Sequence, residues 1–242
     1  MKTHIVIQAR MGSTRLPGKI LKPLCGLPML EQIVERAKKC NNVDEVIVAT
    51  SDSLADDVVQ EFCEIRNYKY FRGSEKDVLD RFYKCTTEYK SELIIRMTAD
   101  NALFDPSIID EGIEYYMSNS YDYVYYAQGM PLGTAIELFS YEALSSAWRE
   151  AVDDECREHV TLFMYRSGNK FKWNKPQSGK YNHENIRLTT DTEEDYRLVK
   201  EIYEALYPIN SDFTLDDVLQ YISDNPTVLE SNKHVKQKVT NY

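Results

Sequence analysis

The segment QARMGSTRLPGK, residues 8–19, follows the short apolar run Ile5-Val6-Ile7 and precedes a helical pattern over residues 30–37. A buried strand, a polar loop and an amphipathic helix in this order are typical of the first unit of an α/β protein. Open α/β sheets bind their ligands in loops at the carboxyl ends of the strands. The segment therefore predicts both the fold class and a ligand-binding loop.

Strand and helix patterns alternate along the rest of the chain. Strands are expected at 46–49, 68–71, 93–95, 121–126, 135–139, 171–173 and 186–188. Helices are expected at 54–62, 78–85, 106–116, 141–150, 154–166, 196–206 and 214–223, with Asp105 and Thr214 as N-caps of two of them. This order predicts an α/β protein with a mostly parallel sheet covered on both faces. We expect one domain over residues 1–230, with a small lobe at about 127–180, and a polar, frayed tail over 231–242.

Composition fits a globular protein, since 43% of the 242 residues are hydrophobic and 28% are charged. No apolar run approaches the roughly 18 residues of a membrane span, and the N-terminal apolar stretch is too short for a signal peptide. The five cysteines are scattered and form no CxxC pair, which favours reduced thiols over disulfides or a zinc site. We therefore expect a cytoplasmic protein without a membrane partner.

The charge distribution is uneven. Asp and Glu outnumber Lys and Arg by 39 to 29, for a net charge of −10, which disfavours binding to a nucleic-acid backbone. Residues 1–30, in contrast, carry five Lys and Arg residues and no acid, and the first acidic residue is Glu31. Unless this is chance clustering near a terminus, it indicates a small, highly charged anionic ligand.

The side chains of the loop are those of a phosphate-binding site. Gly12 and Gly18 allow close approach of the backbone, hydroxyl and N–H donors follow Gly12, and three cations can neutralise phosphate: Arg10, Arg15 and Lys19. The loop is not a Walker A sequence, because five residues separate the two glycines and Ile20 follows the lysine. A strand-to-helix turn without a ligand is the alternative, and the three cations argue against it.

Beyond these features, QARMGSTRLPGKILKPL resembles the opening of the cytidylyltransferase family typified by the spore coat polysaccharide biosynthesis protein SpsF. It is also similar to the CMP-Kdo synthetases, which open with PARxxSTRLPGK. The resemblance extends to about residue 207 through 47–50, FRGSEKDVLDR (71–81), the strand ending near Asp100, REHVT (157–161) and TTDTEED (189–195). It implies a Rossmann-like nucleotidyltransferase (GT-A-like) fold, CTP as donor, Mg²⁺ dependence, a small anionic acceptor for surface polysaccharide, and a homodimer.

Two aspartates are candidate metal ligands. Asp100 and Asp191 each follow a predicted strand, and Mg²⁺ prefers one or two carboxylates together with phosphate oxygens and water. The residues alone leave other roles open, because Asp191 or Thr192 could cap a helix and Asp100 could stabilise a turn. Both aspartates match metal-binding positions of the Kdo synthetases. The resemblance therefore implies a catalytic group of Arg15, Lys19, Asp100 and Asp191.

The resemblance also assigns binding residues for both substrates. Candidate nucleotide contacts are Gln8, Ala9, Arg10, Gly12, Ser13, Arg15, Lys19, Arg72, Gly73, Ser74 and Asp77. For Asp77 the alternative is a helix cap that pairs with Arg81 four residues later.

Candidate acceptor contacts are Glu137 and His159. The chain departs from the family pattern on this side: Ala135 replaces an Asp, Ala99 a Gly and Ala102 a Pro. These changes leave the particular acceptor open.

Two other functions are compatible with such a fold. A glycosyltransferase would usually carry a DxD metal motif, whereas residues 98–102 read TADNA. A non-catalytic nucleotide-binding protein would not need the lysine and both aspartates. Release of pyrophosphate from CTP, with and without acceptors, distinguishes all three functions.

Overall fold

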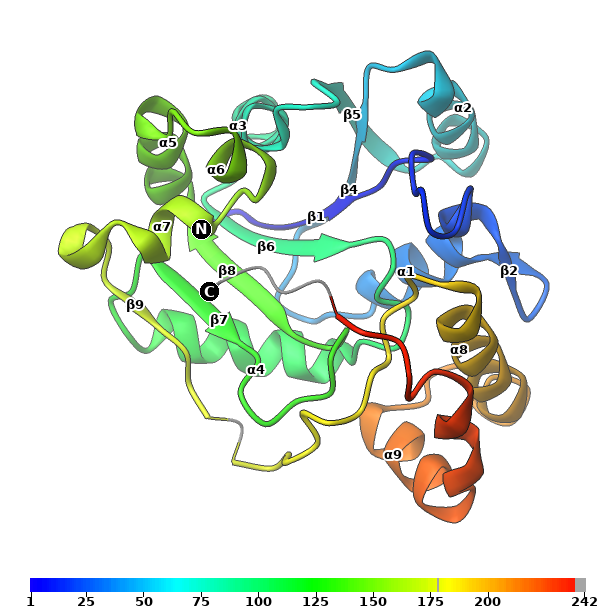
Figure 1. Ribbon diagram of the computed structural model, residues 1–242. Helices are drawn as coiled ribbons and strands as arrows, with labels where there is room; N and C mark the ends of the chain where they lie inside the picture. The colour runs from blue at the N-terminus through cyan, green and yellow to red at the C-terminus, as the bar shows by residue number, and fades with distance from the viewer. Residues whose placement is uncertain (178, 238–242) are drawn as a thin grey trace.

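The computed structural model describes residues 1–177 and 179–237 and is built on one seven-stranded sheet (Figure 1). Its strand order is β5-β4-β1-β6-β8-β7-β9. The strands are β1 (Thr3–Gln8), β4 (Glu45–Ser51), β5 (Lys69–Gly73), β6 (Leu93–Thr98), β7 (Tyr123–Tyr126), β8 (Ile136–Ser140) and β9 (Trp173–Asn174). Strands β5, β4, β1 and β6 pair in parallel, β8 is antiparallel to β6 and β7, and β9 is parallel to β7. β2 (Pro23–Leu24) and β3 (Leu27–Pro28) form a separate hairpin. The predicted fold class, a mostly parallel mixed sheet flanked by helices, is confirmed.

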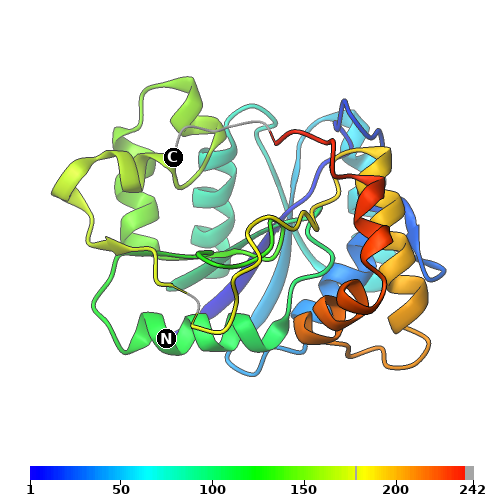
Figure 2. The same ribbon diagram turned by 60° about the horizontal axis from the view of Figure 1, so that its bottom comes forward.

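Helices pack with both faces of the sheet, as Figure 2 shows for α4 on one side and α3 on the other. One hydrophobic cluster contains α1 (Met29–Ala37), α2 (Asp57–Arg66), α4 (Pro106–Met117), α8 (Glu193–Leu206) and α9 (Leu215–Asp224). The other contains α3 (Val78–Tyr89), α5 (Tyr141–Glu150), α6 (Asp154–Glu158) and α7 (Leu162–Arg166). Short 3₁₀ helices are η1 (Lys19–Leu21), η2 (Leu54–Asp56), η3 (Gly168–Lys170) and η4 (Pro226–Ser231).

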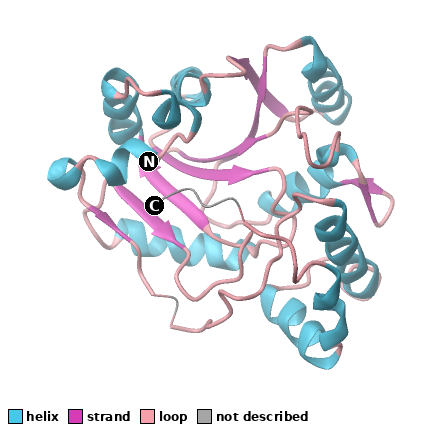
Figure 3. Cartoon of the chain, viewed as in Figure 1, coloured by secondary structure: helices cyan, strands magenta, loops and turns pink. Residues whose placement is uncertain are grey.

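The central strands β1, β4 and β6 are largely apolar on both faces. In β6, Ile95 belongs to the first cluster and Ile94 to the second, because successive side chains alternate between faces. Polar residues interrupt this second face at Gln8 in β1, Arg96 in β6 and Glu137 in β8. Figure 3 separates the strands from the loops that follow them, and these loops carry the candidate site.

Two sequence-based assignments are wrong. The helix expected over 154–166 is two short helices, α6 and α7, because residues 159–161 turn and Thr161 directs its hydroxyl to Glu137. Residues 186–188 form only a single bridge with Leu132 instead of a strand. The segment around Leu132 turns at Gly129 and Gly133, whose φ angles are 86° and 99°. Because these angles are not those of an extended strand, strand pairing does not continue beyond the single bridge.

Part of the chain expected to fray is fixed in the structure. Asn232 is 3% exposed, and its amide donates to the Arg187 carbonyl at 3.1 Å and to Asp195 at 2.9 Å. Residues 238–242 of the predicted tail lie outside the described residues. The five cysteines are free, and burial raises the pKa of the Cys40 and Cys63 thiols to about 12. Among the described residues, we find no helix with the length and apolar character needed to span a membrane.

Candidate active site

The loop after β1 is held in place by buried polar groups. The Met11 amide donates to the Asp56 carboxylate at 2.6 Å, and Asp56, which is 2% exposed, also accepts a hydrogen bond from Ser51. Gly18, with a φ of 67°, precedes η1, on which Lys19 stands. The loop encloses a cavity of about 280 Å³, here called the loop cavity. Its lining comprises Gln8, Arg10, Gly12, Ser13, Thr14, Arg15, Lys19, Ile20, Thr98, Ala99, Asp100 and Asp191.

Lys19 brings the two candidate metal ligands together. Its Nζ donates to Asp100 Oδ2 at 2.7 Å, to Asp191 Oδ1 at 3.1 Å and to the Thr190 carbonyl at 3.0 Å. Lys19, Asp100 and Asp191 are only 12%, 22% and 14% exposed. Two carboxylates that are distant in sequence thus bind the same ammonium group, and all three side chains line the loop cavity.

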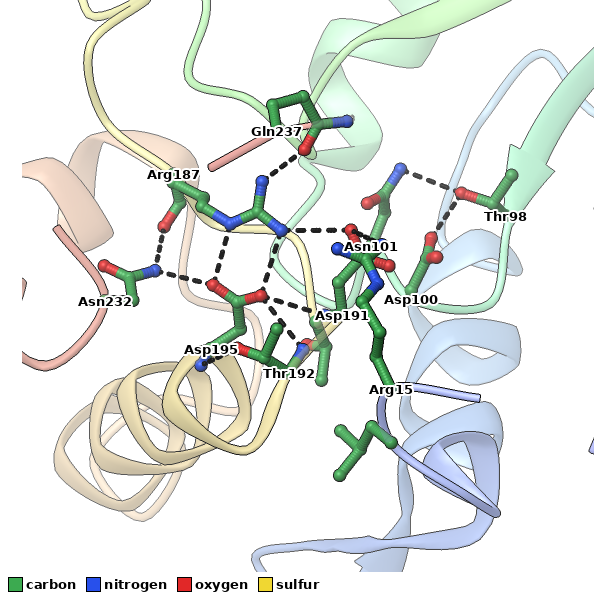
Figure 4. Close-up of polar contacts among 12 residues, drawn as sticks. Arg15, Thr98, Asp100, Asn101, Arg187, Asp191, Thr192, Asp195, Asn232 and Gln237 are labelled. Atoms are coloured by element: carbon green, nitrogen blue, oxygen red, sulfur yellow. Dashed lines mark hydrogen bonds and ion pairs between the residues drawn. The ribbon is translucent and has the colours of Figure 1, made fainter. Parts of the chain in front are cut away.

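Asp191 is surrounded by cations. Arg15 and Arg187 lie 3.1 and 3.0 Å from its Oδ2 atom (Figure 4). Burial alone would raise the pKa of Asp191, but Lys19, Arg15 and Arg187 outweigh burial and lower that pKa. Asp191 is therefore held as a carboxylate.

The helix after Asp191 begins with a different cap. Thr192 is the N-cap of α8 and forms a capping box with Asp195. Asp191 therefore does not cap the helix. Asp195 is fully buried and binds Arg187 through Nε at 2.8 Å and Nη2 at 3.0 Å. Figure 4 shows the Arg187 guanidinium between Asp195, Asp191 and Gln237.

Asp100 is fixed by its own strand. The Thr98 hydroxyl donates to Asp100 Oδ1 at 2.5 Å, and the Asp100 carbonyl accepts from the Thr190 amide at 2.8 Å. The loop after β6 and the segment that carries Asp191 are therefore joined by a backbone hydrogen bond.

A second cavity, here called the lobe cavity, adjoins the first and measures about 320 Å³. The two cavities share Arg15, Thr98, Asp100 and Asp191. The remaining lining comprises Arg96, Met97, Asn101, Phe104, Tyr125, Leu132, Gly133, Ala135, Glu137, His159, Thr189 and Gln237. The paired aspartates thus stand at the junction of two compartments.

The FRGSEKDVLDR segment is mostly engaged in structural contacts. Asp77 caps α3 by accepting from the Asp80 amide at 2.9 Å, and it pairs with Arg157 of α6 rather than with Arg81. Arg81 is buried and donates to the Ser74 carbonyl at 2.7 Å. The Arg72 guanidinium donates to the carbonyl of Ser51, the last residue of β4, and to the carbonyl of Ser53 just beyond it.

The predicted site residues thus fall into five groups. Lining the loop cavity are Gln8, Arg10, Gly12, Ser13, Arg15, Lys19, Asp100 and Asp191, whereas Glu137 and His159 line the lobe cavity. Ala9 is buried behind the loop. The structure does not bring Arg72, Gly73 and Ser74 to the lining of these two cavities. Asp77 instead lines a separate cavity of about 490 Å³, together with Arg10 and Arg157.

Several residues of the site were missed by the sequence reasoning. Thr98 orients Asp100, Arg187 orients Asp191, and Arg96 enters the lobe cavity. The sequence does carry a signal for two of them. Arg96, Thr98 and Asp100 alternate with apolar residues at the end of an apolar strand, a spacing that puts the strand residues Arg96 and Thr98 on the same face. Arg187 precedes Asp191 by four residues, but no periodicity rule applies to the irregular segment between them.

The residues present fit a magnesium ion that is bound together with a phosphate ligand. The site provides two carboxylates on one cation, and Mg²⁺ commonly uses one or two carboxylates, with phosphate and water completing the shell. Within residues 1–177 and 179–237 we find no group of three or more His, Cys, Asp or Glu side chains suited to hold a metal by themselves. The protein would thus supply only part of the shell.

A mostly parallel sheet with a cationic loop after β1, facing two aspartates, is the arrangement expected of a nucleotidyltransferase. Comparison with known proteins gives the family. A model of the cytidylyltransferase family matches residues 4–239, and the chain belongs to that family. It is a nucleotidyltransferase enzyme.

Two relatives span nearly the whole chain. An uncharacterised protein of Methanocaldococcus jannaschii is 39% identical over 239 residues, covering 98% of this chain and 97% of its own length. The spore coat polysaccharide biosynthesis protein SpsF of Bacillus subtilis is 34% identical over 227 residues, covering 91% of this chain and 94% of its own. The predicted resemblance to the SpsF family is confirmed.

Solved structures give the same fold. A cytidylyltransferase of Leptospira borgpetersenii is 28% identical, with a TM-score of 0.89 and full coverage of both chains. A CMP:2-keto-3-deoxy-manno-octonic acid synthetase complexed with CTP is 17% identical, with a TM-score of 0.64, covering 85% of this chain and 99% of its own. At that identity the second likeness concerns the fold alone.

Proposed function

We propose that the protein transfers CMP from CTP to an acid sugar, or to a related phosphate or phosphonate, and releases pyrophosphate. The observation that carries this proposal is the meeting of two cavities at Asp100 and Asp191. The loop cavity offers cations for a triphosphate, and the lobe cavity offers room for a second substrate beside it. The family supports CTP as the donor.

In this proposal the chain's residues act mainly by position and charge, as is usual for transfer at phosphorus. Arg15 and Lys19 bind the phosphates next to the loop and stabilise the charge that develops on the leaving pyrophosphate. Asp100 and Asp191 would hold Mg²⁺, which, when bound, neutralises phosphate charge and polarises the reacting phosphoryl group. Lys19, which bridges both aspartates in the structure, turns toward the phosphates when they bind.

The proposed reaction is a single in-line displacement. The acceptor oxygen, lying in the lobe cavity, forms a bond to the α-phosphorus. A hydroxyl acceptor releases its proton to solvent, whereas a phosphate or phosphonate oxygen attacks as the anion. The bond from the α-phosphorus to the oxygen bridging to the β-phosphate breaks, and pyrophosphate leaves with the electron pair. Thr98 and Arg187 keep the aspartates in place during this change.

The product would be a CMP-activated acid for surface polysaccharide or glycoconjugate synthesis, consistent with the SpsF relative. A homodimer and a cytoplasmic location also belong to this proposal. The homodimer rests on the family resemblance, and the location rests on the scattered cysteines and the lack of an apolar run that could span a membrane. Light scattering of the purified protein tests the dimer.

The test of the proposed reaction is an acceptor screen. Sugar acids, sugar phosphates and alkyl phosphonates are offered with each of the four nucleoside triphosphates and Mg²⁺, and pyrophosphate is measured. We expect release that requires CTP, an acceptor and the metal, and that stops with EDTA. Release with another nucleotide in preference to CTP, or transfer from a nucleotide sugar without pyrophosphate, would overturn the proposal.

A further inference from the structure

The lobe cavity contains a charged pair to which the proposed reaction gives no role. Apart from the residues shared with the loop cavity, its charged lining residues in the described chain are Arg96 and Glu137, and His159 lines it as well. Arg96 and Glu137 face each other directly across β6 and β8. They form an ion pair between Arg96 Nη1 and Glu137 Oε2. Both are largely buried, with 16% and 12% of their side chains exposed.

Glu137 is bound on both of its oxygens by the protein itself. Oε2 accepts from Arg96, whereas Oε1 accepts from the Tyr123 hydroxyl at 2.8 Å and the Thr161 hydroxyl at 2.5 Å. These donors come from β6, β7 and the turn between α6 and α7. A carboxylate held in this way is suited to fix a neighbouring cation rather than to bind a substrate hydroxyl.

Arg96 lies between the two cavities. Its Nη2 donates at 3.2 Å to the side chain of Gln8, a residue that lines the loop cavity, and Arg96 is one of the residues that line the lobe cavity. Arginine is the side chain best suited to bind an oxyanion in a part-buried site, because its planar fork matches carboxylate and phosphonate geometry. The position of Arg96, its charge and its contacts with Glu137 and Gln8 therefore indicate that it binds an anionic ligand.

We propose that Arg96 binds an anionic group of the acceptor that is distinct from the attacking oxygen, and that Glu137 is a positioning residue that holds Arg96. This inference rests on the proposed function. The attacking oxygen must lie beside Asp100 and Asp191, whereas Arg96 stands farther back along β6. Arg96 and Thr98 point to the same face roughly 7 Å apart, and Asp100 follows beyond them.

The substrate class follows from this separation. The acceptor is an acid that also carries a hydroxyl, as a sugar carboxylic acid does. A simple alkyl phosphonate has one anionic group, which would itself attack the phosphorus, so it has no second anionic group to reach Arg96. The lobe cavity thus favours hydroxy acids over simple phosphonates.

The test compares matched acceptors and matched variants. A panel of 2-keto sugar acids, each beside its methyl ester, is assayed with CTP for wild type, Arg96→Ala and Arg96→Lys. Arg149→Ala, on the exposed side of α5, is the control. Because a charge-assisted hydrogen bond is lost, Arg96→Ala should raise the KM for the acid by about 10- to 100-fold. The KM for CTP should change by less than about twofold, and Arg96→Lys should recover part of the loss. Wild type should prefer the acid to its ester, and Arg96→Ala should not.

The positioning role of Glu137 is tested by a double-mutant cycle. If Glu137 acts only through Arg96, Glu137→Gln should raise the KM for the acid less than Arg96→Ala does. The double variant should then be no worse than Arg96→Ala alone. Additive effects would show that Glu137 contacts the acceptor itself and would overturn this part of the inference.

Two other results would also decide the question. If Arg96→Ala unfolds, as judged by circular dichroism, Arg96→Gln retains a polar side chain for Glu137 without the charge and is measured instead. An unchanged preference of either variant for the acid over its ester would overturn the inference while leaving the proposed function intact. Failure of the wild type to release pyrophosphate from CTP with every acceptor would overturn the proposed function and this inference with it.

Discussion

Replacement of Lys19 by Met removes the cation that joins the two aspartates while keeping the length of the side chain. At an effective dielectric constant of about 20, an ion pair at roughly 3 Å is worth about 5 kcal/mol of Coulomb energy, and Lys19 makes two such pairs. The variant no longer has to bury an ammonium group, and the desolvation energy that it avoids offsets much of this Coulomb energy. Breaking a buried pair costs about 3–5 kcal/mol, and these side chains retain some exposure, so we expect about 3 kcal/mol of destabilisation near neutral pH.

The pH dependence gives this prediction a second readout. The lowered pKa of Asp191 stabilises the wild-type fold above the unfolded-state pKa, and that contribution is lost as pH falls through the folded-state pKa. Without Lys19 the pKa of Asp191 rises. The difference in unfolding free energy between wild type and variant should therefore be largest near neutral pH and shrink below about pH 4.

Urea unfolding followed by circular dichroism measures both effects, and pyrophosphate release should fall at least about a hundredfold. Lys22→Met is the matched control, because Lys22 pairs with Glu193 at 3.2 Å with 31% and 46% exposure. That change should cost less than about 1 kcal/mol. A Lys19→Met variant with wild-type stability at neutral pH and wild-type activity would refute the reasoning.

Four further changes test other parts of the structure. Gly133→Ala would place a Cβ atom 2.5 Å from the Thr189 amide nitrogen at a φ of 99°, so thermal unfolding should show a loss of more than about 2 kcal/mol. Gly168→Ala, with a φ of 61° and open space around it, should cost about 1 kcal/mol, and equal costs would contradict this account. Asp195→Asn leaves buried Arg187 without its main counter-ion and should cost about 3 kcal/mol or more by urea unfolding; a near-neutral effect would show that Arg187 is stabilised otherwise. Asp100→Asn should keep a native circular dichroism spectrum while losing at least about a hundredfold in pyrophosphate release, and full activity would remove the proposed metal site.

Most of the fold could be predicted because its elements carry local signals. The parallel strands are short apolar runs bounded by polar loops. Several helices begin at side chains that can cap them, such as Asp105 and Thr214, which accept the expected backbone hydrogen bonds. The irregular half was harder to predict, because the break at residues 159–161 depends on contacts with β8 rather than on local propensity.

The candidate site was predictable where it follows strand ends and not where it depends on partners distant in sequence. The loop after β1 and the two aspartates stand after apolar runs, so their common edge could be expected. The position of Lys19 between Asp100 and Asp191 follows from the tertiary structure and has no local sequence signal. The same holds for Arg96, whose significance arises from Glu137 on the neighbouring antiparallel strand.

A crystal structure with Mg²⁺ and a non-hydrolysable CTP analogue tests the central claim most directly. The account predicts the triphosphate in the loop cavity, contacted by Arg15 and Lys19, with the metal ion bound by Asp100 and Asp191. It also predicts the lobe cavity open beside the α-phosphorus. A triphosphate bound elsewhere, or a metal ion that contacts neither aspartate, would contradict it.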